Sequence, residues 1–175
     1  MNLNQQPQGS IPRPIEPRGF FTGVKIRPII IGAVVDYVAT YALITLYLIV
    51  YYIKEPLENG GLPAEALQEA LKEMLSSQEG LLALLVIGAL CTILGGYLAG
   101  RIARTEEVKH GAFVGAVSLI VGVLQTGMAG EASPVPYWYE LLGYVLAIPA
   151  GALGGSFAQG RAKPSIPRST QERRL

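Results

Sequence analysis

Four long apolar runs, separated by short polar stretches, dominate the chain. They cover approximately residues 28–53, 81–100, 111–129 and 137–158. Each run has roughly 20 residues, and a helix of that length, at about 1.5 Å per residue, crosses a hydrocarbon core of about 30 Å. The pattern predicts an all-α, polytopic membrane protein whose four transmembrane helices form one domain over residues 26–160.

A fifth element is predicted between the first two runs, where apolar residues are spaced rather than continuous. Residues 63–77 read PAEALQEALKEMLSS, and proline is favoured in the first turn of a helix. We expect a short extracytoplasmic amphipathic helix that rests on the bundle or the outer leaflet, or that docks a partner. Its apolar face carries Leu67, Ala70, Leu71, Met74 and Leu75, and its polar face carries Glu65, Glu69 and Glu73.

Small residues recur at intervals of three and four in the apolar runs. These spacings place them on one face of each helix, where two backbones can approach closely. We expect a tight glycine-rich bundle of the glycine-zipper type, with a glycine-lined channel formed by oligomerisation as the alternative. The glycines assigned to helix packing are Gly32, Gly88, Gly96, Gly100, Gly111, Gly115, Gly122, Gly143, Gly151 and Gly155, and the same stripes include Thr92 and Ser118.

The composition indicates lipid as the solvent. Half of the 175 residues are hydrophobic and 15% are charged, which is too apolar for an ordinary soluble domain of this size. The net charge of +1 argues against nucleic-acid binding, because nucleic-acid-binding proteins concentrate Lys and Arg to neutralise phosphates. The expected surroundings are the bilayer, with a membrane protein partner or further copies of the chain.

The positions of the bases predict the orientation. Lys and Arg gather before the first run, between the second and third, and after the fourth, whereas the other two loops hold only Lys54 and Lys72. By the positive-inside rule, both termini face the cytoplasm. The expected location is the cell (inner) membrane, which the chain crosses several times. Residues 1–25 and 161–175 lack apolar periodicity and are expected to be disordered cytoplasmic tails.

Asp36 is the ionisable residue that stands out, because it lies about two turns inside the first helix. A carboxylate in hydrocarbon costs several kcal/mol, roughly, so it should face the bundle interior, pair with another group or be protonated. Arg101 and His110 are the expected partners, and Tyr37 and Thr40 complete the candidate polar site. Three interpretations remain open: a structural pairing between helices, a protonatable or ion-binding site in a transport path, and an incidental residue reached by water.

The charged stretch between the second and third runs offers little catalytic chemistry. Residues 101–110 are expected to form a short solvated turn, with bases at headgroup depth. His110 is the single histidine, so it lacks the second histidine of a metalloprotease pair, and no Walker loop, GxGxxG or GxSxG motif is present. We therefore expect no enzyme activity, no cofactor and no metal.

Three stretches carry a resemblance to a group of known proteins. RPIIIGAVVD in the first helix, GGYLAGRIAR at the end of the second and HGAFVGAVSLIVGVL at the start of the third resemble uncharacterised small four-helix bacterial integral membrane proteins. The resemblance implies a membrane fold and a cell-membrane location, and no reaction.

The predicted function is therefore non-enzymatic. The leading hypothesis is an accessory or scaffold subunit of a larger membrane assembly. The alternative is a small oligomeric channel or a proton-coupled carrier in which Asp36 titrates.

Overall fold

The described part of the chain is helical. The computed structural model describes Gly19 and residues 22–53, 64–128 and 135–160. Apart from Gly19 and residues 22–25, the two predicted tails lie outside these ranges. The helices are α1 (Ile26–Leu48), which continues as the π-helical segment η1 (Ile49–Ile53), α3 (Ala64–Ser76), α4 (Gln78–Ala103), α5 (Glu107–Met128) and α6 (Tyr137–Gly160). Four of them, α1 with η1, α4, α5 and α6, are long and apolar enough to cross a membrane. The predicted all-α class is therefore confirmed, and each of the four predicted spans is a helix of suitable length and hydropathy.

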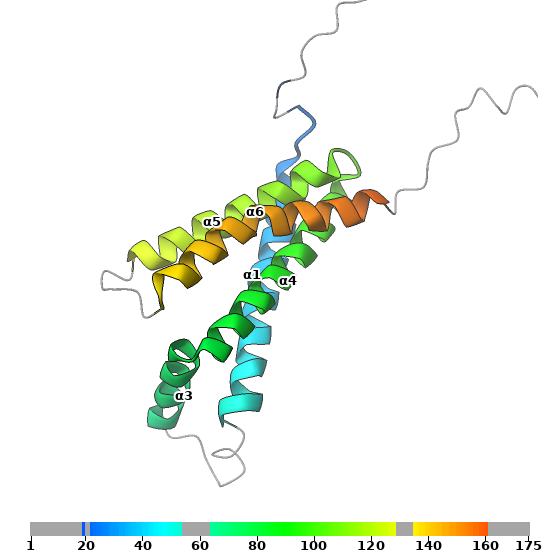
Figure 1. The fold of residues 1–175 in the computed structure, drawn as a ribbon. Helices are drawn as coiled ribbons and strands as arrows, with labels where there is room; N and C mark the ends of the chain where they lie inside the picture. Colours follow the sequence, from blue (N-terminus) through cyan, green and yellow to red (C-terminus); the bar gives the residue numbers. More distant parts are fainter. Residues whose placement is uncertain (1–18, 20–21, 54–63, 129–134, 161–175) are drawn as a thin grey trace, which may run out of the picture.

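The four long helices form two antiparallel pairs that cross. Figure 1 shows α1 beside α4, with α5 and α6 lying across them. The start of α1, the end of α6 and the connection between α4 and α5 lie at one end, which we call the turn end; α3 lies at the other, the α3 end (Figure 1). α6 packs extensively on both α4 and α5, whereas α1 packs mainly on α4 and only lightly on α5. The pairs therefore separate away from the turn end.

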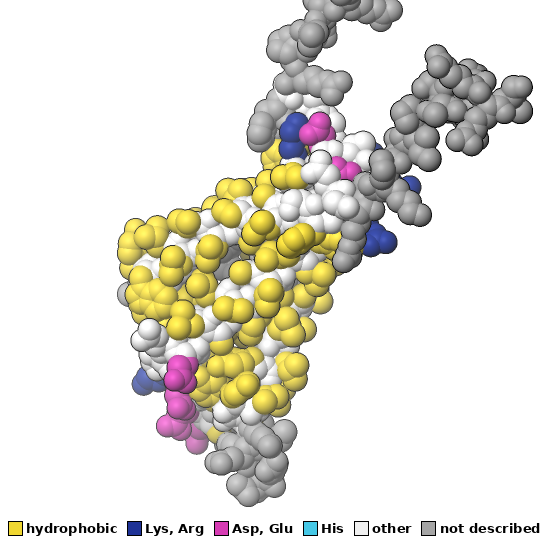
Figure 2. All heavy atoms as spheres, turned by 45° about the vertical axis from the view of Figure 1, so that its right-hand side comes forward, with side chains coloured by type: hydrophobic (Ala, Val, Ile, Leu, Met, Phe, Trp, Pro, Cys, Tyr) yellow, Lys and Arg dark blue, Asp and Glu magenta, His cyan; other side chains and the backbone are white. Residues whose placement is uncertain are grey.

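The surface of the long helices is apolar. Large side chains such as Ile30 of α1, Val86 of α4 and Val145 of α6 are at least half exposed. Figure 2 shows a hydrophobic body with its charged side chains gathered near the two ends. This distribution suits a protein whose middle faces lipid and whose ends face water.

Close backbone contacts hold the helices together near the turn end. A Cβ built on Gly111 would lie 2.8 Å from the Gly155 backbone nitrogen, and one built on Gly96 would lie 3.0 Å from the Gly151 Cα. Gly32 of α1 meets the carbonyl oxygen of Gly95 in the same way, at 2.6 Å. Such approaches leave no space for a side chain. The other glycines of the predicted set with close contacts are Gly100, Gly115, Gly151 and Gly155, and Gly95 and Gly154, which the prediction omitted, also make them.

Two glycines assigned to helix packing do not pack. A Cβ at Gly88 or Gly143 would meet nothing within 4 Å, and one at Gly122 would meet only a ring carbon of Tyr144, at 3.6 Å. The assignment of Gly88 and Gly143 is wrong because these residues lie where the helices have separated. Both line a cavity between α4, α5 and α6.

The helix α3 packs on the end of the α1–α4 pair. Ala70 and Met74 are buried against Leu48, Ile53 and Leu84. Leu67 and Leu71, which the sequence assigns to the same apolar face, are instead exposed, at 42% and 43%. Only part of the apolar face of α3 therefore contacts the bundle. The glutamates of α3 are exposed.

The connection between α4 and α5 is shorter than the predicted turn over residues 101–110. Residues 101–103 belong to α4 and residues 107–110 belong to α5, so only residues 104–106 connect the helices. Arg104 ends α4 in the left-handed region, with φ of 56°, and its N–H donates to the Gly100 carbonyl at 3.1 Å. The prediction was too long because helices α4 and α5 continue past the ends of their apolar runs into the charged residues. Arg101 in the last turn of α4 and Glu107 in the first turn of α5 complement the helix dipoles.

Alanine substitutions at glycine test the packing at the turn end. Gly111→Ala places a methyl group against the α6 backbone and should destabilise the bundle by about 1–3 kcal/mol, the usual cost of overpacking. Gly143→Ala is the matched control, because its methyl group enters open space, and alanine favours a helix by up to about 1 kcal/mol over glycine. Unfolding in mixed detergent micelles measures both. Equal stability of the two variants would contradict the described contacts.

Candidate functional site

A buried carboxylate lies where α1, α4 and α5 meet. Asp36 of α1 is 5% exposed. The Thr92 hydroxyl of α4 lies 3.3 and 3.2 Å from its two carboxylate oxygens, and the Ser118 hydroxyl of α5 donates to Oδ2. Thr40, one turn along α1, lies 3.5 Å from Oδ1. Asp36 therefore links three helices through hydroxyl groups.

The expected partners of Asp36 lie elsewhere. Arg101 donates from Nη1 to the Tyr97 hydroxyl at 2.6 Å, and its guanidinium carbon lies 5.9 Å from the centre of that ring. His110 bonds to backbone groups at the turn end. The predicted pairing of Asp36 with Arg101 or His110 is therefore wrong. Arg101 is exposed near the end of α4, where its charge reaches water, so it needs no buried carboxylate.

The hydroxyls around Asp36 have a second set of acceptors. The Thr92 hydroxyl oxygen is 3.0 Å from the Gly88 carbonyl oxygen, and the Ser118 hydroxyl oxygen is 3.1 Å from the Val114 carbonyl oxygen. Each hydroxyl has a single hydrogen. It can be donated either to the Asp36 carboxylate or to the carbonyl one turn back in its own helix, a common bond for Ser and Thr in helices.

Two complete hydrogen-bond arrangements follow from this choice. When Asp36 is ionised, Thr92 and Ser118 donate to the carboxylate. When Asp36 is protonated, its O–H donates to the Ser118 oxygen, while Ser118 and Thr92 donate to the carbonyls of their own helices. Rotation of two hydroxyls is sufficient to pass between them. The site can therefore gain or lose one proton without moving a helix.

A groove runs past Asp36 on the side where α1 and α5 diverge. It has a volume of about 720 Å³, and its walls are mostly apolar residues of α1 and α5, with Gly88 and Thr92 of α4 at its base. Tyr37, Tyr41 and Gln125 line it as well. The Gln125 amide donates to the Tyr37 hydroxyl at 3.0 Å and to the Tyr41 hydroxyl at 3.2 Å. We call these three residues the rim cluster.

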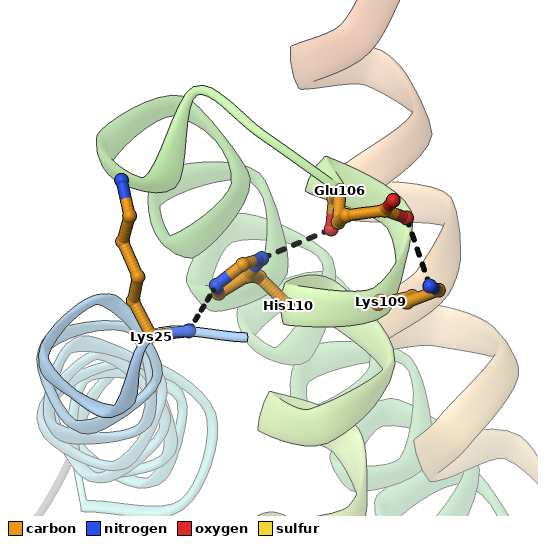
Figure 3. A network of polar contacts seen from close by, with 4 residues as sticks. All are labelled: Lys25, Glu106, Lys109 and His110. Atoms are coloured by element: carbon orange, nitrogen blue, oxygen red, sulfur yellow. Dashed lines mark hydrogen bonds and ion pairs between the residues drawn. The ribbon is translucent and has the colours of Figure 1, made fainter. Parts of the chain in front are cut away.

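His110 joins the starts of α1 and α5 at the turn end. It is fully buried. The Lys25 backbone N–H donates to Nε2 at 2.9 Å, and the Glu106 carbonyl oxygen lies 2.9 Å from Nδ1, so Nδ1 carries the hydrogen (Figure 3). The Lys25 ammonium also donates to the Ala103 carbonyl at 3.2 Å. Both ring nitrogens are occupied by backbone groups, which indicates a structural role.

The described residues contain no other constellation of chemical groups typical of an active site. In the described ranges, no three His, Cys, Asp or Glu side chains lie close enough together to hold a metal ion. Cys91 is buried and unbridged. Comparisons of the chain with known protein families, curated proteins and solved structures find no match. The assignment of function therefore rests on the geometry of the site and the surrounding surface.

Removing the His110 ring tests its structural role. His110→Ala leaves the Lys25 N–H without its ring acceptor, and a buried unsatisfied group costs about 1–3 kcal/mol. The Glu106 carbonyl loses the ring donor but keeps the His110 backbone N–H, at 3.1 Å. We expect a clear loss of stability in detergent micelles. Lys109→Ala is the control, because it removes an exposed ion pair with Glu106, 3.0 Å long, worth about 0–1 kcal/mol. A variant at His110 as stable as the unmodified protein would refute the structural role.

Proposed function

We propose that the protein is a non-enzymatic accessory or scaffold subunit of a larger membrane assembly. The observation that carries this proposal is the rim cluster. Tyr37 and Tyr41 are 46% and 51% exposed, and Gln125 is exposed as well. Tyr37 lies about 16 Å along α1 from Ile26 at about 1.5 Å per residue, roughly half the thickness of the hydrocarbon core. Polar groups at that depth favour contact with another protein over contact with lipid chains.

The groove beside the rim cluster suits a transmembrane helix of the partner. Its walls are apolar, and its volume of about 720 Å³ accommodates side chains from such a helix. A hydroxyl or amide group on the partner helix would complete the hydrogen bonds of Gln125. Association of two copies of this chain through the same groove is the competing outcome of the test.

The proposed setting is the bacterial inner membrane, with both termini in the cytoplasm. Most described basic residues lie at the turn end: Lys25, Arg27, Arg101, Arg104 and Lys109. The remaining one, Lys72, lies in α3. This asymmetry supports a cytoplasmic turn end. In this orientation α3 is an extracytoplasmic amphipathic helix, and the glycine contacts give the bundle its glycine-zipper character.

Co-purification from the native membrane tests the assembly. The tagged protein is extracted in mild detergent or nanodiscs, and companions are identified by mass spectrometry. We expect a stoichiometric membrane partner whose retention falls about three- to thirty-fold in Gln125→Leu, the range for an interhelical hydrogen bond worth about 0.6–2 kcal/mol. Tyr51→Phe is the control, because Tyr51 is 72% exposed but lies outside the groove. Recovery of the chain alone, or only with copies of itself, would contradict the proposal.

A second candidate function is proton-coupled transport at Asp36, as a carrier or a small oligomeric channel. The specific observation in its favour is the pair of hydrogen-bond arrangements around Asp36, because a proton-carrying group must be satisfied in both protonation states. The adjoining groove gives the carboxyl a route for exchange. If Asp36 served only to hold the helices together, a single hydrogen-bond arrangement, for one protonation state, would be sufficient.

Asp36→Asn tests this candidate, because the asparagine amide can both donate to and accept from the same hydroxyls but cannot release a proton. If Asp36 carries protons, the variant reaches the membrane in normal amounts and melts near the unmodified protein, while proton uptake into proteoliposomes is abolished. Ser156→Ala, which removes an exposed hydroxyl from α6, is the control. Reduced abundance and stability of Asp36→Asn, with proton uptake per folded protein unchanged, would exclude the transport role.

A further inference from the structure

A second cavity contains a carboxylate that the candidate site does not use. It lies between α4, α5 and α6 and has a volume of about 320 Å³. Glu140, in the first turn of α6, lines it. Its Oε1 atom is buried and has no hydrogen-bond partner among the described residues. An unpartnered buried acceptor is costly, and it favours a ligand that donates a hydrogen bond.

The second cavity and the groove beside Asp36 share one wall. Thr92 and Ser118, the two hydroxyl donors to Asp36, line both spaces, as do Gly88 and Gly122. The absence of side chains at the two glycines keeps this wall thin. A group in the second cavity can therefore reach the hydroxyls that bind Asp36 without entering the lipid-facing groove.

The lining between Glu140 and the shared wall is partly polar. Thr126 of α5 lies 3.3 Å from the Tyr144 hydroxyl of α6, and Gln125 also lines the cavity. Its volume of about 320 Å³ leaves room for several waters. The titratable residues in the described lining are Glu140, Tyr139 and Tyr144, all from α6; α4 and α5 contribute none.

We propose that this cavity is a hydrated path that delivers protons from the α3 end to Asp36, and that Glu140 is the proton acceptor at its entrance. A hydronium ion transfers a proton to the Glu140 carboxylate and becomes water. The proton then passes along waters and hydroxyls to the Asp36 carboxylate, and Glu140 returns to its ionised form. One charge moves for each proton, and no bond between heavy atoms changes. The inference rests on the proposed proton exchange at Asp36, the second candidate function.

Cysteine accessibility tests the path independently of proton exchange. Gly143→Cys and Gly88→Cys fit without clashes, because a Cβ at either position meets nothing within 4 Å. A membrane-impermeant methanethiosulfonate reacts with thiolates in water, so both should react from the α3 end at least about tenfold faster than Val145→Cys, which lies on the exposed surface of α6. Buried Cys91 should stay unmodified. Lys72→Cys and Arg104→Cys mark the two ends in intact cells and inverted vesicles.

The outcomes separate the path from the function on which it rests. Reaction of Gly143→Cys no faster than Val145→Cys, or only from the turn end, overturns the path even if Asp36→Asn abolishes proton uptake. If the cysteines react as expected, Glu140→Gln should slow proton uptake severalfold while Asp36→Asn abolishes it. Unchanged uptake in a folded Glu140→Gln protein overturns the role of Glu140. Unchanged uptake in Asp36→Asn overturns the proton exchange itself.

Discussion

The close approach of the α4, α5 and α6 backbones is the constraint on which the rest of the structure depends. Lipid supplies no hydrophobic force between helices, so association relies on dispersion, weak hydrogen bonds and polar contacts at short range. Gly151 meets both Gly96 of α4 and Gly111 of α5, which makes α6 the common neighbour of the other two. Gly32 and Gly95 attach α1 to α4 near the same level. Helices held this closely at one level, and crossing as Figure 1 shows, must separate further along.

That separation determines where polar groups can be accommodated. Asp36 lies one turn beyond Gly32, where α1 begins to diverge from α5. The wider spacing of the helices there leaves room for the Asp36 side chain and the three hydroxyl groups around it. Glu140 lies at the opposite end of α6 from its glycine contacts, where α4, α5 and α6 no longer touch closely. The same crossing therefore gives the bundle a closely packed turn end, fixed by glycine contacts and by His110, and leaves space between the helices where they diverge.

The sequence predicts the spans because twenty-residue apolar runs have few alternatives in lipid. It predicts the contact glycines less well, because periodicity places residues on one face of a helix but does not say where two helices diverge. Gly111 and Gly151 pack against a neighbouring backbone, whereas Gly88 and Gly143 border a cavity.

The partners of Asp36 had a signal in the sequence that was not used. Thr92 and Ser118 belong to the predicted small-residue stripes, and their hydroxyls could have been recognised as hydrogen-bond donors to Asp36. Charge complementarity pointed instead to Arg101 and His110. No sequence signal sets Glu140 apart from the other glutamates, and only the crossing of the helices places it beside a cavity.

The two cavities differ in what can cover them. The groove beside Asp36 opens along the lipid-facing side of α1 and α5, whereas the cavity at Glu140 is bounded by three helices. A partner helix seated on the rim cluster would close the first and leave the second as the route from water to Asp36. A carboxyl reached from one side only can couple its protonation to an event in the partner, because it does not equilibrate with both sides at once. Assembly and proton exchange are therefore compatible roles: the partner that the rim cluster favours would supply the missing wall of the proton site.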